Sequence, residues 1–149
     1  MNCAVTDIEL ALEYAHSGSN PTTITQVNSG WVFLGLNQVL KGCCLLVAEP
    51  VINTIADLDK DVRNKFFDDM LMVGKAITNI TGAAKCNYLL LGNKDPVLHV
   101  HIIPRFSDEP KEYQEHGPWK YKNYVKFEIE RDLPLILELK NEIDRLASK

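Results

Sequence analysis

Apolar side chains recur every three or four residues between Asp57 and Thr81, which predicts one long amphipathic helix. The residues of its apolar stripe are Leu58, Val62, Phe66, Met70, Val73, Ile77 and Ile80. Asp57, Asp59 and Asp61 place negative charge at the expected start of this helix, where the helix dipole favours it. Gly82 supplies a stop, because glycine adopts the left-handed conformation that often ends a helix.

Two shorter segments have the same helical spacing. Residues 6–16 form a short amphipathic stretch with Thr6 as its cap, and it ends at the turn formers of residues 17–21. A last helix is expected over residues 133–147, with Asp132 and Pro134 suited to its first turn.

Strand character appears in runs between these helices. The expected strands are residues 22–27, 31–36, 43–48, 86–91 and 98–104. The first two are separated by Asn28-Ser29-Gly30, which is good hairpin chemistry. Consecutive strands joined by short turns, with helices in separate blocks, predict an α+β fold around an antiparallel sheet of about five strands. Residues 106–125 are polar and rich in proline, glycine and aromatics, so we expect an ordered loop there.

Length and charge restrict the classes of function. The 149 residues fit a single domain, with a core over about 22–110 and a C-terminal loop and helix over 111–149. The net charge of -4 disfavours nucleic acid and anionic membrane surfaces as partners. The sequence contains no signal peptide pattern and no apolar run of the roughly 20 residues that a membrane span needs. We therefore expect a soluble, cytoplasmic protein.

The cysteines do not form a recognisable site. Cys3, Cys43, Cys44 and Cys86 include no C-x-x-C pair, and the adjacent Cys43 and Cys44 would point to opposite faces of a strand. We expect reduced, partly buried thiols, as is usual in the cytosol.

The segment that carries chemistry is His99-Val100-His101. On a strand, Leu98, Val100 and Ile102 face one side, whereas His99 and His101 share the other. Two imidazoles roughly 7 Å apart along one strand face can engage neighbouring groups of a single ligand. Histidine titrates near neutral pH, so it can attack as a neutral nucleophile or donate a proton as a cation.

Local chemistry alone leaves other readings of this pair open. The histidines can simply decorate a solvated sheet face. They can also bind zinc, iron or copper, because His-x-His on a strand is a common ligand pair. A metal site needs a further ligand, and His116 or Asp108 reaches the pair only through loop folding.

The surrounding sequence resembles the histidine triad (HIT) superfamily. The run His99 to Arg105 is similar to the end of the signature His-φ-His-φ-His-φ-φ, in which φ is apolar and Pro-Arg commonly follows. The upstream segments resemble the family in the same order: residues 40–47 the glycine-containing strand, 57–82 the long helix, and 87–93 the strand and turn before the histidines. The similarity covers roughly residues 30–110, including the stretch after the motif, and implies a HIT-like fold.

The resemblance also implies a function and roles for residues. HIT proteins are typically nucleotide hydrolases or nucleotidyl transferases, in which a histidine attacks the α-phosphorus and forms a covalent intermediate without a metal or other cofactor. His99 falls on this nucleophile, and His101 falls on the last motif histidine, which holds the phosphate oxygens. Asn93 matches a polar turn residue near the phosphate, and Asn37 matches an acidic residue that contacts the ribose. The resemblance further implies a homodimer and a small-molecule nucleotide as ligand.

The sequence departs from the family pattern at three places, one of which is Asn37, an uncharged residue where relatives often carry an acidic one. Val97 occupies the first motif position, where the family has a histidine that supports the nucleophile, so a catalytically silent nucleotide-binding module is the alternative function. Glu49-Pro50-Val51 stands where relatives tend to carry basic residues and a histidine, which weakens a polyphosphate site if this strand end lines it. Arg105 directly follows the strand and is a candidate phosphate ligand, with a surface ion pair as the alternative.

Overall fold

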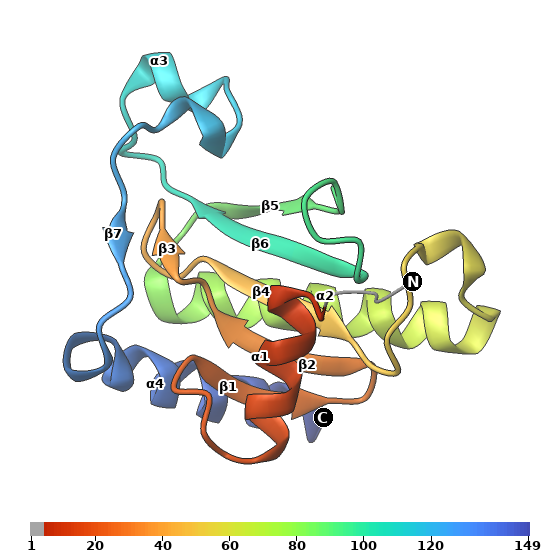
Figure 1. The fold of residues 1–149 in the computed structure, drawn as a ribbon. Helices are drawn as coiled ribbons and strands as arrows, with labels where there is room; N and C mark the ends of the chain where they lie inside the picture. The colour runs from red at the N-terminus through yellow and green to blue at the C-terminus, as the bar shows by residue number, and fades with distance from the viewer. Residues whose placement is uncertain (1–4) are drawn as a thin grey trace.

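The computed structural model describes residues 5–149, and its main elements follow the expected order (Figure 1). The helices are α1 (Asp7–His16), α2 (Lys60–Thr81), α3 (Lys111–Gln114) and α4 (Ile129–Ala147), with 3-10 turns at Ile55–Asp57 and Pro118–Lys120. The strands are β1 (Thr23–Val27), β2 (Gly30–Leu34), β3 (Asn37–Gln38), β4 (Cys44–Ala48), β5 (Lys85–Leu89), β6 (His99–Arg105) and β7 (Val125–Lys126). Of the cysteines, Cys3 lies outside the described residues.

The main sheet has five strands in the order β1-β2-β4-β6-β5, and each neighbouring pair is antiparallel. The predicted α+β class and antiparallel sheet are therefore confirmed. β6 lies between β4 and β5, so backbone hydrogen bonds hold the strand with the histidines along both of its sides.

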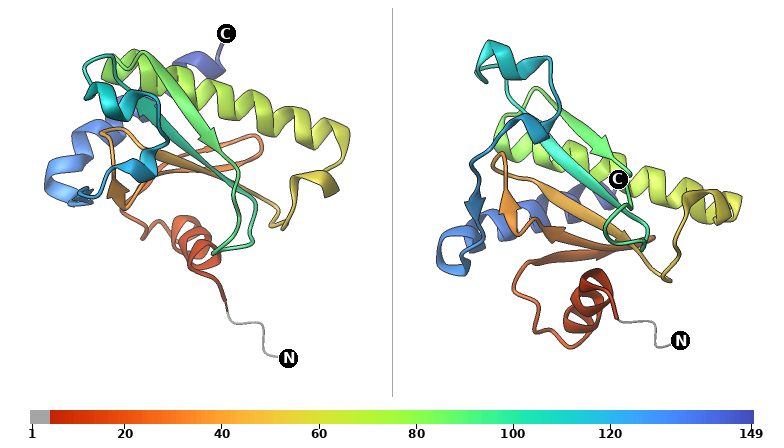
Figure 2. Two further views of the ribbon diagram at one scale, coloured as in Figure 1. Left: turned by 90° about the horizontal axis from the view of Figure 1, so that it is seen from above. Right: turned by 45° about the horizontal axis from the view of Figure 1, so that its top comes forward.

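The helices α2 and α4 cover one face of this sheet, and α1 lies on the opposite face (Figure 2). The main core fills the space beneath α2 and α4. Leu98, Val100 and Ile102 point into it, as the alternation along the strand predicted. Phe66, at the centre of the stripe on α2, is fully buried in the same core.

A second, smaller core lies beneath α1, on the face that carries the histidines. It consists of Leu12, Ala15, Phe33, Val47 and Val97, with Ile8 and Ala11 partly buried against it. The first motif position is therefore a packing position in this chain: Val97 is 1% exposed and supports the helix above it. The histidine face is not an open sheet surface, because α1 covers part of it.

The ends of the helices follow local chemistry. Thr6 and Glu9 form a reciprocal capping box at the start of α1, and Gly82 ends α2 in the left-handed conformation with φ 76°. The expected start of the last helix was wrong: α4 begins at Ile129, so Pro134 lies inside the helix, beyond its first turn.

No helix in the described part of the chain is long and apolar enough to cross a membrane.

The segment expected to be a loop between β6 and α4 has structure of its own. It contains α3, which extends beyond β5 in Figure 1, and β7, which pairs with β3 in a separate two-stranded sheet. Asn37 is opposite Lys126, and Gln38 is opposite Val125. This pairing attaches the C-terminal part of the chain beside the β2–β4 connection.

Candidate functional site

His99 and His101 lie on the face of β6 that points toward α1, and their rings make an edge-to-face contact with centroids 5.0 Å apart. This separation is shorter than the roughly 7 Å expected from the strand repeat, because the two rings tilt toward each other. His99 is 7% exposed, whereas His101 is only partly buried. A single ligand group can therefore contact both imidazoles.

The backbone fixes the protonation pattern of His99. Its Nδ1 lies 2.6 Å from the carbonyl oxygen of Val97, which can only accept a hydrogen bond. Nδ1 therefore carries the proton, and Nε2 carries a free lone pair. The residue at the first motif position thus orients His99 through its main chain, whatever side chain it bears.

His101 is held in its neutral form at physiological pH. Burial lowers the pKa of this imidazole, and the positive charge that His99 acquires on protonation lowers it further. A neutral imidazole keeps one N–H, which can donate to a phosphate oxygen, and one lone pair.

A polar hollow of about 600 Å³ opens in front of the two histidines. The residues that line it are Val5, Thr6, Asp7, Ile8, Leu45, Leu91, Gly92, Asn93, Lys94, Asp95, His99 and His101. Asn93 and Lys94 come from the turn before β6, and both are exposed. Among residues 5–149, neither side chain has a hydrogen-bonding or ion-pair partner, so both are free to bind a ligand.

Asp95 connects this turn to the start of α1. One carboxylate oxygen accepts a hydrogen bond from the backbone N–H of Ile8 at 3.0 Å, and the other accepts one from the N–H of Val97 at 3.1 Å. The first interaction satisfies an N–H that the helix itself leaves unpaired. Asp95 therefore positions both the helix and the residue that orients His99.

An apolar pocket of about 450 Å³ lies on the other side of His101, so this histidine lines both spaces. Besides His101, the residues that line this apolar pocket are Asp7, Ile8, Ala11, Thr22, Phe33, Leu34, Gly35, Leu36, Asn37, Val39, Cys43, Cys44, Leu45, Val47, Ile103 and Tyr124. Ligand pockets for small molecules usually combine such apolar walls with a few polar groups. The two adjoining spaces therefore fit a ligand with an apolar ring system at one end and an anionic group at the other.

Neither thiol in the apolar pocket, Cys43 or Cys44, is an alternative nucleophile, because burial raises the pKa of both. Burial raises the pKa of Cys43 to about 11, so almost none of it is thiolate at neutral pH. Cys43 and Cys44 are free and buried, and Cys86 is free and partly buried. Among the residues described here, His99 is thus the better nucleophile on this face.

Several residues proposed from the sequence come together at this site, but Arg105 does not. Asn93 lines the polar hollow, Asn37 lines the apolar pocket, and Val97 lies behind His99. Arg105 is buried, and its five donors are all used. They bond to the carboxylate of Glu109, the side chain of Asn87 and the carbonyl oxygens of Tyr113 and His116. Arg105 therefore has no free donor for a phosphate, contrary to the prediction from the sequence, and its ion pair with Glu109 is buried rather than on the surface.

Glu49 does not belong to the site of His99 and His101. Its carboxylate contacts Nε2 of His16 at the end of α1 and accepts a hydrogen bond from the indole N–H of Trp31 at 2.7 Å. It lines neither of the two spaces beside His101, so its charge does not face a ligand there. Glu49 instead attaches the C-terminal end of α1 to the sheet.

Sequence reasoning missed the contributions of α1, Lys94 and Tyr124. The helix itself was predicted, but no local signal says which face of the sheet it covers.

The alternative of a metal site at His99 and His101 has no third ligand in the structure. Within residues 5–149, no group of three or more His, Cys, Asp or Glu residues is placed to hold an ion.

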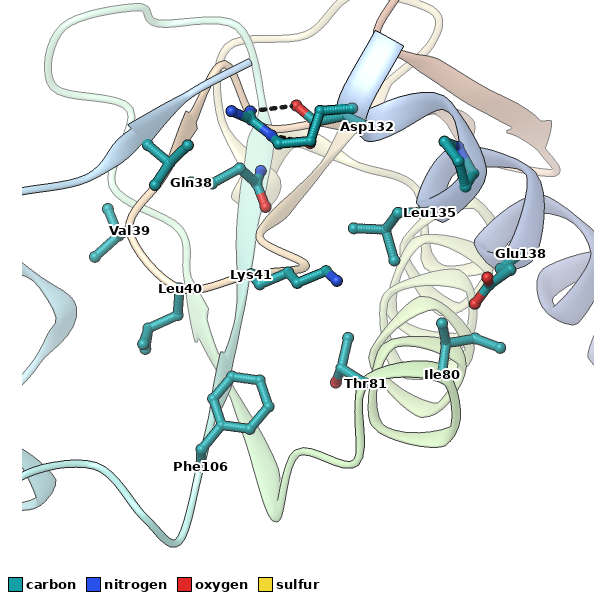
Figure 3. A pocket seen from close by; sticks show the side chains of 13 residues that line it. Gln38, Val39, Leu40, Lys41, Ile80, Thr81, Phe106, Asp132, Leu135 and Glu138 are labelled. Carbon is teal, nitrogen blue, oxygen red and sulfur yellow. Dashed lines mark hydrogen bonds and ion pairs between the residues drawn. The ribbon is translucent and has the colours of Figure 1, made fainter. Parts of the chain in front are cut away.

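Another hollow, of about 520 Å³, lies between α4, the end of α2 and the β3–β4 connection (Figure 3). Lys41 extends into it, with Leu135 and Glu138 from α4 nearby. Asp132 is paired with Arg131 at its edge. The hollow contains no histidine or cysteine, so we assign it no part in the chemistry at His99.

No known sequence-family model matches the chain, and no curated protein matches it. Solved structures do. A histidine triad protein from Bradyrhizobium japonicum is 26% identical with a TM-score of 0.71, over 86% of this chain and 96% of that one. A histidine triad protein from Marinobacter aquaeolei is 20% identical with a TM-score of 0.72, over 84% and 91%. A hypothetical histidine triad nucleotide-binding protein from Sulfolobus tokodaii is 17% identical with a TM-score of 0.72, over 92% and 93%.

Proposed function

The chain has the fold of the histidine triad (HIT) superfamily, and we propose that it binds a nucleotide and transfers or hydrolyses its nucleotidyl group through His99. The observation that carries this proposal is the hydrogen bond from Nδ1 of His99 to the Val97 carbonyl oxygen. This bond leaves Nε2 unprotonated and facing the polar hollow, which is the state that a nucleophile needs.

The proposed reaction has two steps. Nε2 of His99 forms a bond to the α-phosphorus, while the leaving group departs with the bonding electrons and takes a proton from water. The attached imidazole then carries a positive charge, which the Val97 carbonyl oxygen stabilises. In the second step water attacks the phosphorus and gives up a proton, which neutralises the hydroxide left by the first step. The bond between phosphorus and Nε2 breaks with its electrons returning to Nε2, so the nucleoside monophosphate is released and neutral His99 is restored.

The surrounding groups have separate roles. The N–H of neutral His101 and the side chains of Asn93 and Lys94 donate to the phosphate oxygens, whose negative charge grows during the attack. The amide of Asn37 has no side-chain partner among residues 5–149, and it binds a ribose hydroxyl. The base enters the apolar pocket beside Ile8 and Phe33.

The charge around the hollow favours a substrate with little negative charge. Lys94 is the only lysine or arginine among the lining residues, and Asp7 and Asp95 oppose it. The lining thus carries no surplus of lysine or arginine charge, so the site offers little compensation for a polyphosphate chain. A nucleoside 5′-phosphoramidate, which has a single phosphorus, suits this balance better than a dinucleoside polyphosphate.

The experiment is incubation with adenosine 5′-phosphoramidate, with release of AMP as the readout. His99→Ala should lower the rate by about a thousandfold, because removal of a nucleophile leaves only binding and electrostatic effects. His116→Ala is the matched control, since this histidine is exposed and lines neither space beside His101. An adenylylated protein, detected by mass after quenching in alkali, should appear with wild type and not with His99→Ala. Unchanged AMP release by His99→Ala would exclude this nucleophile.

We also propose that the protein forms a homodimer along β5. This strand is at the edge of the sheet, so one side of its backbone is unpaired. On α2, the exposed side chains of Phe67 and Leu71 lie in the same helical stripe as Gly74, which contacts Tyr88 of β5. A second copy that extends the sheet would cover this patch. Leu71→Glu should therefore lower the mass measured by light scattering from that of a dimer to that of a monomer.

A further inference from the structure

The short sheet formed by β3 and β7 separates two hollows. Asn37 of β3 and Tyr124, the residue before β7, line the apolar pocket beside His101. Val39, the residue after β3, lines both spaces. Gln38 and Val125 line the other hollow, which Figure 3 shows from close by. The C-terminal segment therefore contributes to the apolar pocket through Tyr124, a residue outside the sequence region that resembles the HIT family.

Two large side chains at the mouth of this pocket are unusually exposed. Leu36 is 66% exposed and Tyr124 is 48% exposed, and both line the same space. The phenol group of Tyr124 has no hydrogen-bonding partner among residues 5–149. Exposed apolar groups that share one concave site mark a surface that a ligand covers.

The backbone holds both residues in place. The N–H of Phe127 donates to the carbonyl oxygen of Leu36 at 2.8 Å, and Asn37 pairs with Lys126 directly beyond it. In addition, the guanidinium of Arg131 donates to the carbonyl oxygen of Lys126 at 2.6 Å, which fixes the segment to α4. Tyr124 directly precedes the paired residues of β7, so this pairing limits where its ring can lie beside the pocket.

We propose that Tyr124 is the base-selecting residue of the nucleotide site, where its ring stacks on the purine that fills the apolar pocket. This inference rests on the proposed function. A purine is a flat, apolar ring system with a larger face than a pyrimidine, so it gains more contact with an aromatic side chain. Leu36 covers the base from the side of β3, while Asn37 remains available for the ribose.

The test compares binding of AMP with binding of ribose 5-phosphate, which has the same sugar and phosphate but no base. Tyr124→Ala should weaken AMP binding about tenfold and leave ribose 5-phosphate binding unchanged, because only the base contacts the ring. Tyr124→Phe should bind AMP as wild type does. Val125→Ala is the matched control, since it shortens the adjacent side chain that lines the other hollow. Wild type should also bind AMP more tightly than CMP, and Tyr124→Ala should reduce this preference.

The outcomes separate the two proposals. Wild-type affinity for AMP in Tyr124→Ala overturns the role of Tyr124 and leaves the nucleotide site intact. An equal loss of AMP and ribose 5-phosphate binding also overturns it, because the substitution then acts on the site as a whole. Failure of wild type to bind AMP at all overturns the proposed function itself. Thermal unfolding of each variant without ligand checks that the fold is retained.

Discussion

The carbonyl oxygen of Val97 lies 2.6 Å from Nδ1 of His99, so the orientation of the proposed nucleophile depends on main-chain geometry and not on the Val97 side chain. The Val97 side chain instead stabilises the fold, because it is packed in the small core beneath α1. Stability and turnover should therefore respond differently to substitution at this position.

Val97→Ala should lower the free energy of unfolding by about 2 kcal/mol, through lost burial and the cavity left behind. Its rate of AMP release at saturating substrate should stay within a few fold of wild type, since the carbonyl group is retained. Urea unfolding and steady-state kinetics on the same preparation measure both quantities. A thousandfold loss of rate in a folded variant would show that the side chain itself supports His99.

Placing a histidine at position 97 should increase neither stability nor turnover. In Val97→His a larger polar ring would enter the packed space shared with Leu12 and Phe33, whose side chains offer it no hydrogen bond. We expect a less stable protein with no faster turnover, as polar groups buried without partners cost free energy. A faster and equally stable variant would contradict this reading.

Stability should fall below about pH 6.5 in a way that depends on His101. Burial lowers the pKa of this imidazole in the folded state, so between the folded and unfolded pKa values the unfolded chain binds more protons. The stability that neutral His101 contributes is fully present above the pKa of histidine in the unfolded chain. It is lost as the pH falls toward the lower pKa of His101 in the folded protein. The difference in free energy of unfolding between pH values of about 7.5 and 5.5 should be smaller in His101→Gln than in wild type. The exposed His116→Gln variant should keep the wild-type difference.

Glu109→Gln should destabilise the segment after β6, because it leaves Arg105 buried without a counter-charge. Burial raises the pKa of Glu109, but hydrogen bonds from Arg105, the Tyr121 hydroxyl and the Phe106 N–H hold it below its usual value. Breaking such a pair costs about 3 kcal/mol. The double variant Arg105→Met, Glu109→Leu should be more stable than Glu109→Gln alone, as urea unfolding at neutral pH can show. The opposite order would mean that the charge on Arg105 is not the cause.

Asp95→Ala should loosen α1 without affecting α2. The variant loses the hydrogen bonds to the N–H groups of Ile8 and Val97, which together stabilise the fold by about 1–2 kcal/mol. Amide hydrogen exchange should accelerate over residues 7–16 and stay unchanged over residues 60–81. Asp95→Asn retains one acceptor and should give an intermediate result. Uniform acceleration throughout the chain would point to general destabilisation instead.

The sequence predicted the elements whose signals are local. The cap at Thr6, the stripe on α2, the stop at Gly82 and the alternation along β6 all follow from neighbours within a few residues. The start of α4 was misplaced because Pro134 favours a first turn, whereas the helix begins at Ile129, where the Asp132 carboxylate accepts a hydrogen bond from the Glu128 N–H. The pairing of β3 with β7 had no local signal, since each strand has only two residues and the partner is far along the chain.

The residues of the candidate site also differ in whether a local signal predicts them. His99, His101 and Asn93 were found because they lie in one continuous segment that resembles a known motif. Arg105 follows that segment directly, yet it bonds to groups from β5 and from the next turns, which no spacing rule reveals. The apolar side chains of α1 and Tyr124, which precedes β7, come from opposite ends of the chain, and only the tertiary structure brings them to His101.

The contact between Ile8 and Asp95 joins residues 87 positions apart, and this has a consequence during synthesis on the ribosome. The helix that roofs the site is made first, but its anchor at Asp95 and its packing partner Val97 emerge much later. Until then Leu12 and Ala15 have only part of their final surroundings and stay open to chaperones or to other nascent chains. The segment that leads into β6, with Asp95 and Val97, therefore completes the cover over the two imidazoles just before they are synthesised.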